Sequence, residues 1–311
     1  KGKHDMWHDH GPGTDIVPQI YYSANFYTTR AVDIIAKHPI ADAPLFLYLP
    51  YQNVHSPDTL PPDWETMDFP GFGPTELHVY ANMIHMLDQG VMNVSAALKA
   101  RPGMWEATLV VFCADNGGIG KYGNNYPLRG HKHDPWEGGT RVAAFISGGF
   151  VPDAVRGTHS GDKLVHAADW YATFCALAGV DATNSPVIGG KARPIDGVNV
   201  WPLLTGRTAT APRRITPTTE VSIIDVGAAG ADGSPAWYKL ITLAGQSNYY
   251  GTNASQTAAT DPCLAGAQPD PPQPGRTDPI VNGDGKGGKG CPVCNPTRPC
   301  LYDVLADPSE R

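Results

Sequence analysis

An apolar run that ends in a carboxylate and an amide constrains the fold and function of this chain more than any other feature. Residues 108–114 are mostly β-branched, aliphatic or aromatic, and Asp115, Asn116 and two glycines follow directly. Such a run predicts a buried strand of a parallel sheet, and ligand sites in these sheets lie at the carboxyl ends of strands. Carboxylate and amide oxygens suit a hard cation such as Ca²⁺ better than zinc. We therefore expect Asp115 and Asn116 to be metal ligands, with an ordinary turn as the alternative.

Two further apolar runs, residues 44–50 and 142–146, predict neighbouring strands. His55 follows the first run closely, where an imidazole can transfer protons. Ahead of the second run lies a basic loop that carries Arg129, His131 and Lys132. A cationic loop facing an acidic metal site suits an oxyanion substrate, whose charge the metal and the lysine would share. The alternatives are a histidine bonded to backbone and a solvated basic loop.

The order of apolar periodicities predicts an α/β domain followed by a small antiparallel sheet. Helices are expected at residues 23–37, 75–100 and 169–177, and helices alternate with strands up to about residue 204. Short strands are expected at 220–224, 237–243 and 301–304, interrupted by a Gly/Pro-rich tract at 266–299. We assign residues 1–206 to the α/β domain and residues 207–311 to the small subdomain.

The charge balance excludes several classes of partner. The formal net charge is −7, which argues against nucleic acid or an anionic membrane surface as the main partner. No apolar run is long enough to cross a bilayer.

The cysteines fall into two groups. Cys113 and Cys175 lie in predicted elements and are expected to be buried free thiols. The tail holds the other four, which predict disulfides, with a zinc knuckle at the Cys-x-x-Cys spacing as the alternative: Cys263, Cys291, Cys294 and Cys300. Two glycosylation sequons, at Asn93 and Asn253, combine with these cysteines to favour the secretory route.

In this order the segments resemble the formylglycine-dependent sulfatases of the alkaline phosphatase superfamily, of the arylsulfatase B (N-acetylgalactosamine-4-sulfatase-like) type. The residues that carry the resemblance are Leu45-Phe46-Leu47-Tyr48-Leu49 with Val54-His55, residues 93–99, Asp115-Asn116-Gly117-Gly118, Pro127-Leu128-Arg129-Gly130-His131-Lys132, Trp136-Glu137-Gly138-Gly139-Thr140-Arg141, residues 195–201, residues 301–304 and residues 307–311. The fold implied is a mixed, mostly parallel sheet flanked by helices, with a small C-terminal antiparallel sheet subdomain.

The resemblance also implies parts that this chain does not contain. Family members begin with two Asp metal ligands and a Cys-x-Pro-Ser-Arg motif, whose cysteine is oxidised to the formylglycine nucleophile. These belong upstream of residue 1, so we expect a truncated sulfatase that is inactive as given. Cys294 imitates the motif in Cys294-Asn295-Pro296-Thr297-Arg298, but no helical pattern follows it.

The resemblance assigns the following roles. One Ca²⁺ would be held partly by Asp115 and Asn116, Lys132 would bind the sulfate, and His55 would be the general acid, all around one cavity. Arg129 and His131 are expected on the substrate side, with holding the loop as the alternative. The substrate would be a sulfated glycan or a small aryl sulfate, and the compartment extracellular or lysosome-like.

Three other functions remain open at this stage. One is a formylglycine phosphonate or phosphodiester hydrolase of the same superfamily. The second is a catalytically dead sulfatase-like module that binds glycans. The third is a plain structural module, which the polar side chains at strand ends disfavour.

Overall fold

The computed structural model describes residues 6–13, 22–62, 69, 76–120, 123–160, 163–183, 194–229, 233–242, 294 and 299–306. Cys263, Cys291, the Asn253 sequon and the motif at 307–311 lie outside these residues. The chain forms two compact units, residues 1–108 and 109–311. The subdomain boundary near residue 206 stays a prediction.

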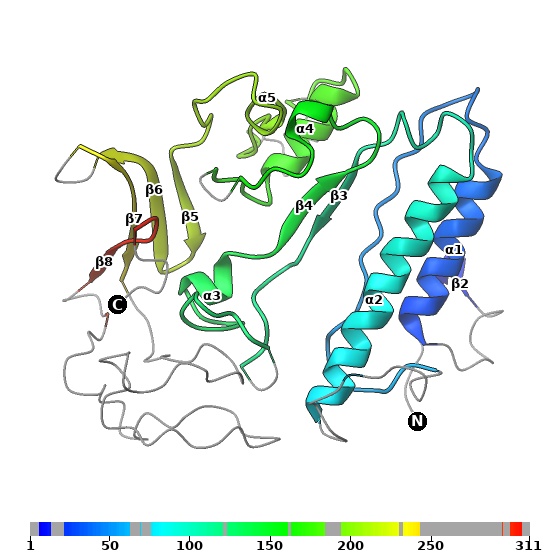
Figure 1. The fold of residues 1–311 in the computed structure, drawn as a ribbon, viewed down its shortest axis with the longest axis horizontal. Coiled ribbons are helices and arrows are strands. Elements are labelled where there is room, and N and C mark those ends of the chain that lie inside the picture. Colours follow the sequence, from blue (N-terminus) through cyan, green and yellow to red (C-terminus); the bar gives the residue numbers. More distant parts are fainter. Residues whose placement is uncertain are drawn as a thin grey trace. The chain divides into compact units, whose positions relative to one another are not determined.

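The first unit is built on a pair of helices (Figure 1). A short hairpin, β1 (Trp7–His8) with β2 (Gly11–Pro12), precedes α1 (Ser23–Lys37) and α2 (Glu76–Lys99). Both predicted helices are confirmed, α1 to the residue. Asn93, the described sequon, is exposed on α2.

The predicted buried strand at residues 44–50 is wrong for this structure. Its backbone has no strand partner among the described residues, and side-chain exposure alternates along it. Leu45, Leu47 and Leu49 are half-buried, whereas Phe46 is 74% and Tyr48 78% exposed. The run therefore has the two-residue period of a strand, but only one of its faces is covered. An apolar run does not reveal how many of its faces other layers cover.

The second unit starts with a two-stranded antiparallel pair. β3 (Val110–Cys113) pairs with β4 (Ala144–Ser147), and the rings of Phe112 and Phe145 stack at 5.1 Å. We expected a parallel neighbour for this run. The described connection contains only one short helix, α3 (Glu137–Thr140), whereas a parallel neighbour needs a crossover that spans the sheet.

In the described residues after β4, three short helical elements come first and the C-terminal sheet follows. The helical elements are the 3₁₀ helix η2 (Asp153–Val155), α4 (Asp169–Leu177), which matches its prediction, and α5 (Trp201–Leu204). The sheet is antiparallel in the order β5-β6-β7-β8, formed by β5 (Ile215–Thr219), β6 (Ser222–Ala229), β7 (Pro235–Ile241) and β8 (Cys300–Asp303). The predicted small antiparallel sheet is thus present.

Sequence analysis missed β5 because this segment is rich in threonine and contains Pro217. Proline cannot donate a ladder hydrogen bond, so it is confined to edge strands and bulges. β5 is an edge strand, and its register shifts next to Pro217.

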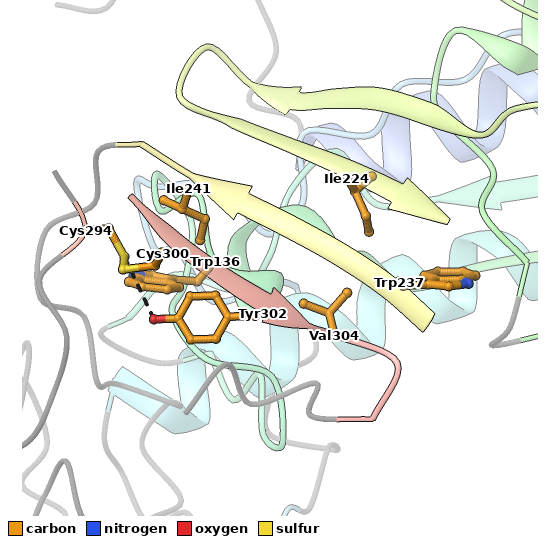
Figure 2. Packing of buried hydrophobic residues seen from close by; sticks show 8 residues of the cluster. All are labelled: Trp136, Ile224, Trp237, Ile241, Cys294, Cys300, Tyr302 and Val304. Atoms are coloured by element: carbon orange, nitrogen blue, oxygen red, sulfur yellow. Dashed lines mark hydrogen bonds between the residues drawn. A yellow bond between two sulfur atoms is a disulfide. The ribbon is translucent and has the colours of Figure 1, made fainter. Parts of the chain in front are cut away.

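The core of the second unit joins this sheet to a residue from the β3–β4 connection. Figure 2 shows Trp136 beside the Cys294–Cys300 disulfide and Tyr302, with further contributions from Ile224, Trp237, Ile241 and Val304. The Trp136 ring meets the Tyr302 ring edge-on at 5.7 Å. The connection that carries the candidate site is therefore fastened to the C-terminal sheet.

A buried ion pair holds α4 in place. Asp169 is fully buried, and its carboxylate accepts hydrogen bonds from the backbone N–H groups of His166 (2.8 Å) and Val198 (3.0 Å). The Arg213 guanidinium completes the set at 2.5 Å. Asp169 is the first residue of α4, and its carboxylate ties two loops together.

The adjacent arginines Arg213 and Arg214 provide a test of this pairing. Arg213→Ala leaves a buried carboxylate without its cation and should lower the free energy of unfolding by about 3 kcal/mol. Arg214 forms an exposed pair with Asp225, so Arg214→Ala should hardly change the melting temperature. Chemical denaturation of both variants measures the difference. Equal effects would contradict the structural role of the Asp169 pair.

Candidate active site

The turn after β3 presents two oxygen ligands. Asp115 is exposed, and its carboxylate has no hydrogen bond or ion pair to another described residue. The Asn116 amide donates through Nδ2 to the Gly117 carbonyl at 2.9 Å, which leaves Oδ1 as its free end. A carboxylate and an amide oxygen fit a hard cation such as Ca²⁺. Within the described residues no group of three or more His, Cys, Asp or Glu side chains could hold a metal ion.

The side chain of Asn125 joins this turn to the basic loop. Its Oδ1 accepts from the Gly118 N–H at 2.8 Å, and its Nδ2 donates to the carbonyls of Gly118 and Gly130, both at 3.1 Å. Three hydrogen bonds from one amide thus connect the backbone after Asn116 with the backbone before Lys132.

Lys132 lies next to the same turn. Its backbone N–H donates to the Gly118 carbonyl at 3.0 Å. The side chain is half-buried, and its ammonium has no hydrogen bond or ion pair to a described residue. The structure therefore brings the segment of Lys132 to that of Asp115 and Asn116 and leaves the ammonium available to an anion.

His131 forms hydrogen bonds and packing contacts within the loop itself. Its backbone N–H donates to Asp134 Oδ2 at 3.0 Å, and its ring Nδ1 donates to the Lys132 carbonyl at 2.7 Å. The ring packs against Gly120, where an added Cβ would lie 2.8 Å from His131 Cδ2. These contacts favour the loop-holding alternative for His131.

Arg129 is buried, with 2% of its surface exposed. Its guanidinium carbon lies 3.7 Å from the centre of the Trp136 ring, a cation–π contact in a desolvated setting. This placement also favours a role in holding the loop over contact with a substrate.

Two glycines allow the turn and α3 to approach at backbone distance. A Cβ on Gly117 would lie 1.7 Å from the Gly138 carbonyl oxygen, and a Cβ on Gly138 would lie 2.3 Å from the Gly130 oxygen. No side chain fits there, because the obstacle in each case is backbone. The Gly117 N–H uses this space to donate to the Gly139 carbonyl at 3.0 Å.

His55 belongs to the first unit, whereas the other predicted site residues belong to the second. It is exposed, and its Nδ1 donates to the Ser56 carbonyl at 2.8 Å. This bond sets the neutral tautomer with the proton on Nδ1 and leaves Nε2 as the second ring position. A histidine held in this way can carry and release a proton at Nε2.

Cys113 and Cys175 are free thiols, but the prediction that they are buried is wrong, because Cys113 is exposed and Cys175 is half-buried. Neither Cys113 nor the Cys294–Cys300 pair offers an activated thiolate. Cys294 and Cys300 form a disulfide with an S–S distance of 2.12 Å, so neither binds zinc in this state. Partial desolvation, and secondarily the Asp115 carboxylate, raises the pKa of the Cys113 thiol. A raised pKa disfavours the nucleophilic form at neutral pH.

Sequence analysis missed the residues that support the site. Asn125 and Glu137 lie inside motifs that carried the resemblance or adjoined them, yet their roles depend on contacts with distant segments. Lys239 forms a buried ion pair with Glu137 across 102 positions of sequence. The one available signal was a lysine between apolar neighbours in a predicted strand.

A comparison of the neighbouring residues Asn124 and Asn125 tests whether the Asn125 side chain joins the turn to the basic loop. Asn125→Ala removes three hydrogen bonds between the turn and the basic loop and should lower the free energy of unfolding by about 2–3 kcal/mol. Asn124 is exposed and accepts one bond, from the Tyr126 N–H, so Asn124→Ala should cost about 0.5 kcal/mol. Urea denaturation measures the free energy of unfolding of both variants. A larger loss of stability in Asn124→Ala than in Asn125→Ala would refute the role of Asn125 in joining the two segments.

No helix in the described part of the chain combines the length and apolar character that a membrane span requires.

Comparison with known proteins gives a consistent result. The family model described as Sulfatase matches residues 4–180. Arylsulfatase J of Mus musculus is 38% identical over 158 residues, which are 50% of this chain and 25% of that protein. A sulfatase of Formosa agariphila is 32% identical over 176 residues (53% and 30%), and arylsulfatase A of Homo sapiens is 30% identical over 194 residues (60% and 34%).

The fold agrees with these relatives. The solved structure titled "Crystal structure of Ps i-CgsB" has a TM-score of 0.54 at 24% identity, and the match covers 73% of this chain and 48% of that one. Together with the family match, this likeness confirms the predicted alkaline phosphatase-like α/β class. The chain spans a quarter to a third of the length of the curated relatives named above. Since the family match extends over more than half of its residues, the chain belongs to the sulfatase family.

Proposed function

We propose that the protein containing this chain hydrolyses sulfate monoesters. The observation that supports this most directly is that two groups of opposite charge, neither with a hydrogen bond or ion pair to a described residue, lie on joined segments. The Asp115 carboxylate and the Lys132 ammonium lie on segments joined by Asn125 and by the Lys132–Gly118 backbone bond. A cation held on the carboxylate side and an ammonium on the other would together receive a dianionic or monoanionic tetrahedral group.

Each residue has a distinct role in this proposal. Asp115 and Asn116 would supply two oxygen ligands to Ca²⁺, which contributes positive charge beside a sulfate oxygen. Lys132 would bind the sulfate and neutralise charge that develops on the bridging oxygen. His55, when a second proton occupies Nε2, would donate that proton to the departing alcohol or phenol and keep the Nδ1 proton on its bond to Ser56. The nucleophile is not among the residues proposed here.

The names and titles of related proteins support a substrate class. Several are named arylsulfatases, and Ps i-CgsB has also been solved in a complex with k-i-k-neocarrahexaose. We therefore favour a sulfated carbohydrate or an aryl sulfate. The Cys294–Cys300 disulfide and the exposed Asn93 sequon support a secretory compartment.

The 311-residue chain alone should not turn over an aryl sulfate at a measurable rate. Cys294 is the cysteine whose sequence context imitates the nucleophile motif, and it is 1% exposed and held in a disulfide. A chromogenic aryl sulfate assay on the purified chain checks this. Turnover that disappears in Cys294→Ala would show that this cysteine is the nucleophile after all.

In the longer protein, Lys132→Ala should damage catalysis far more than folding. Loss of one electrostatic contact to the transition state lowers the rate by about 10²- to 10³-fold. The free energy of unfolding should change by only about 0.5 kcal/mol, because the ammonium has no described protein partner. Steady-state kinetics and a melting curve measure both effects.

Lys163→Ala is the matched control, because Lys163 is also half-buried in the second unit but has no role in the proposed chemistry. It should retain wild-type kcat/KM. Near-normal kcat/KM in Lys132→Ala would remove the lysine from the mechanism.

A further inference from the structure

Lys239 is a fully buried lysine in the middle of the C-terminal sheet. It lies on β7 in a row that crosses all four strands, Thr216–Ile224–Lys239–Tyr302, and every member of the row is buried. Its Nζ donates to Glu137 Oε1 at 2.8 Å and to Thr140 Oγ1 at 3.1 Å. Buried ion pairs can often be replaced by apolar residues at no cost in stability. Stability of the sheet alone therefore does not explain why a lysine is buried here.

Glu137 and Thr140 are the first and last residues of α3. This single helical turn is bonded to both loops of the candidate site. The Gly138 N–H donates to the Arg129 carbonyl at 2.6 Å, and the Gly139 carbonyl accepts from the Gly117 N–H at 3.0 Å. The ammonium thus holds the two ends of an element whose middle residues fasten the site.

The connection continues to the residues of the proposed chemistry. Gly117 directly follows Asn116, and the next residue, Gly118, accepts the backbone hydrogen bond of Lys132. Because Gly117 and Gly138 are at backbone contact distance, a shift of α3 moves the turn with it. No flexible side chain separates α3 from the turn.

We infer that Lys239 is a positioning residue for the candidate active site: through Glu137 and Thr140 it fixes α3, and α3 fixes the segments of Asp115, Asn116 and Lys132. The chemical meaning of these three residues rests on the proposed function. The positional role of Lys239 does not, and it is tested without substrate.

Hydrogen–deuterium exchange of the 311-residue chain reports the order of these segments. In Lys239→Met the amides of Gly117, Lys132 and Gly138 should exchange about tenfold faster or more, because the bonds that protect them lose their support. The double variant Lys239→Met/Glu137→Gln removes both charges of the buried pair, and Arg141, which lies 3.8 Å from Glu137, is one-third exposed and keeps its hydration. Its melting temperature should return towards that of the wild type while these amides still exchange fast.

Arg213→Met is the matched control, because it breaks a second buried ion pair between described residues of the second unit, with Asp169. It should accelerate exchange in α4 and at Val198 and leave Gly117 and Lys132 protected. This comparison separates a local effect at the site from a general loss of stability.

Two outcomes would overturn the inference. One is full recovery of both the melting temperature and the exchange protection in the double variant. This would show that Lys239 and Glu137 only neutralise each other and do not position the site. The other is equal acceleration at Gly117 and Lys132 in Arg213→Met. If Lys239→Met does not fold, the double variant decides alone. Absence of sulfatase activity would leave these exchange results unchanged, so the two proposals fail separately.

Discussion

The arrangement of the second unit depends on the packing of the buried Trp136 indole against the C-terminal sheet. The indole lies in the core of the C-terminal sheet against Tyr302 and the Cys294–Cys300 disulfide, and it carries the Arg129 guanidinium on its face. Its Nε1 is buried without a hydrogen-bond partner among the described residues. Leaving such a donor unsatisfied costs about 1–3 kcal/mol. The packing of the ring on the sheet and the cation–π contact must offset this cost, so shape rather than a hydrogen bond fixes the indole.

Charges in this region divide into two kinds with different physical tasks. Arg129, Glu137 and Lys239 are buried, and each has a partner that compensates its desolvation. Asp115 and Lys132 are at least partly open to solvent, and neither has an ion-pair partner among the described residues. The first kind holds backbone in place, and the second is free to interact with a ligand. A sequence shows all five residues as equally charged, and only their burial separates the two tasks.

The sequence predicted those parts of the fold that depend on local pattern. α1 and α4 have their predicted bounds because their periodicity and flanking residues are local. The Asp115–Asn116 turn after a strand was also predictable. The exposed face of residues 44–50, the antiparallel pairing of β3 and the Lys239–Glu137 pair were not, since each depends on segments far away in the sequence. Arg129 shows the limit most clearly, because a basic loop motif cannot reveal that its guanidinium lies on a tryptophan ring.

The position of Lys132 follows from how its loop is anchored. Residues 129–130 and 135–139 are buried, and the short arc between them, in which only His133 is exposed, is closed by reciprocal bonds between His131 and Asp134. Fixing both ends of so short an arc costs little further loop entropy. At its tip His133 adopts φ 82°, a left-handed conformation that costs on the order of 1–3 kcal/mol in a non-glycine residue. The anchors on either side must supply this energy. The backbone position of Lys132, the residue before His133, therefore depends on Trp136 and α3, although neither is proposed to contact a substrate.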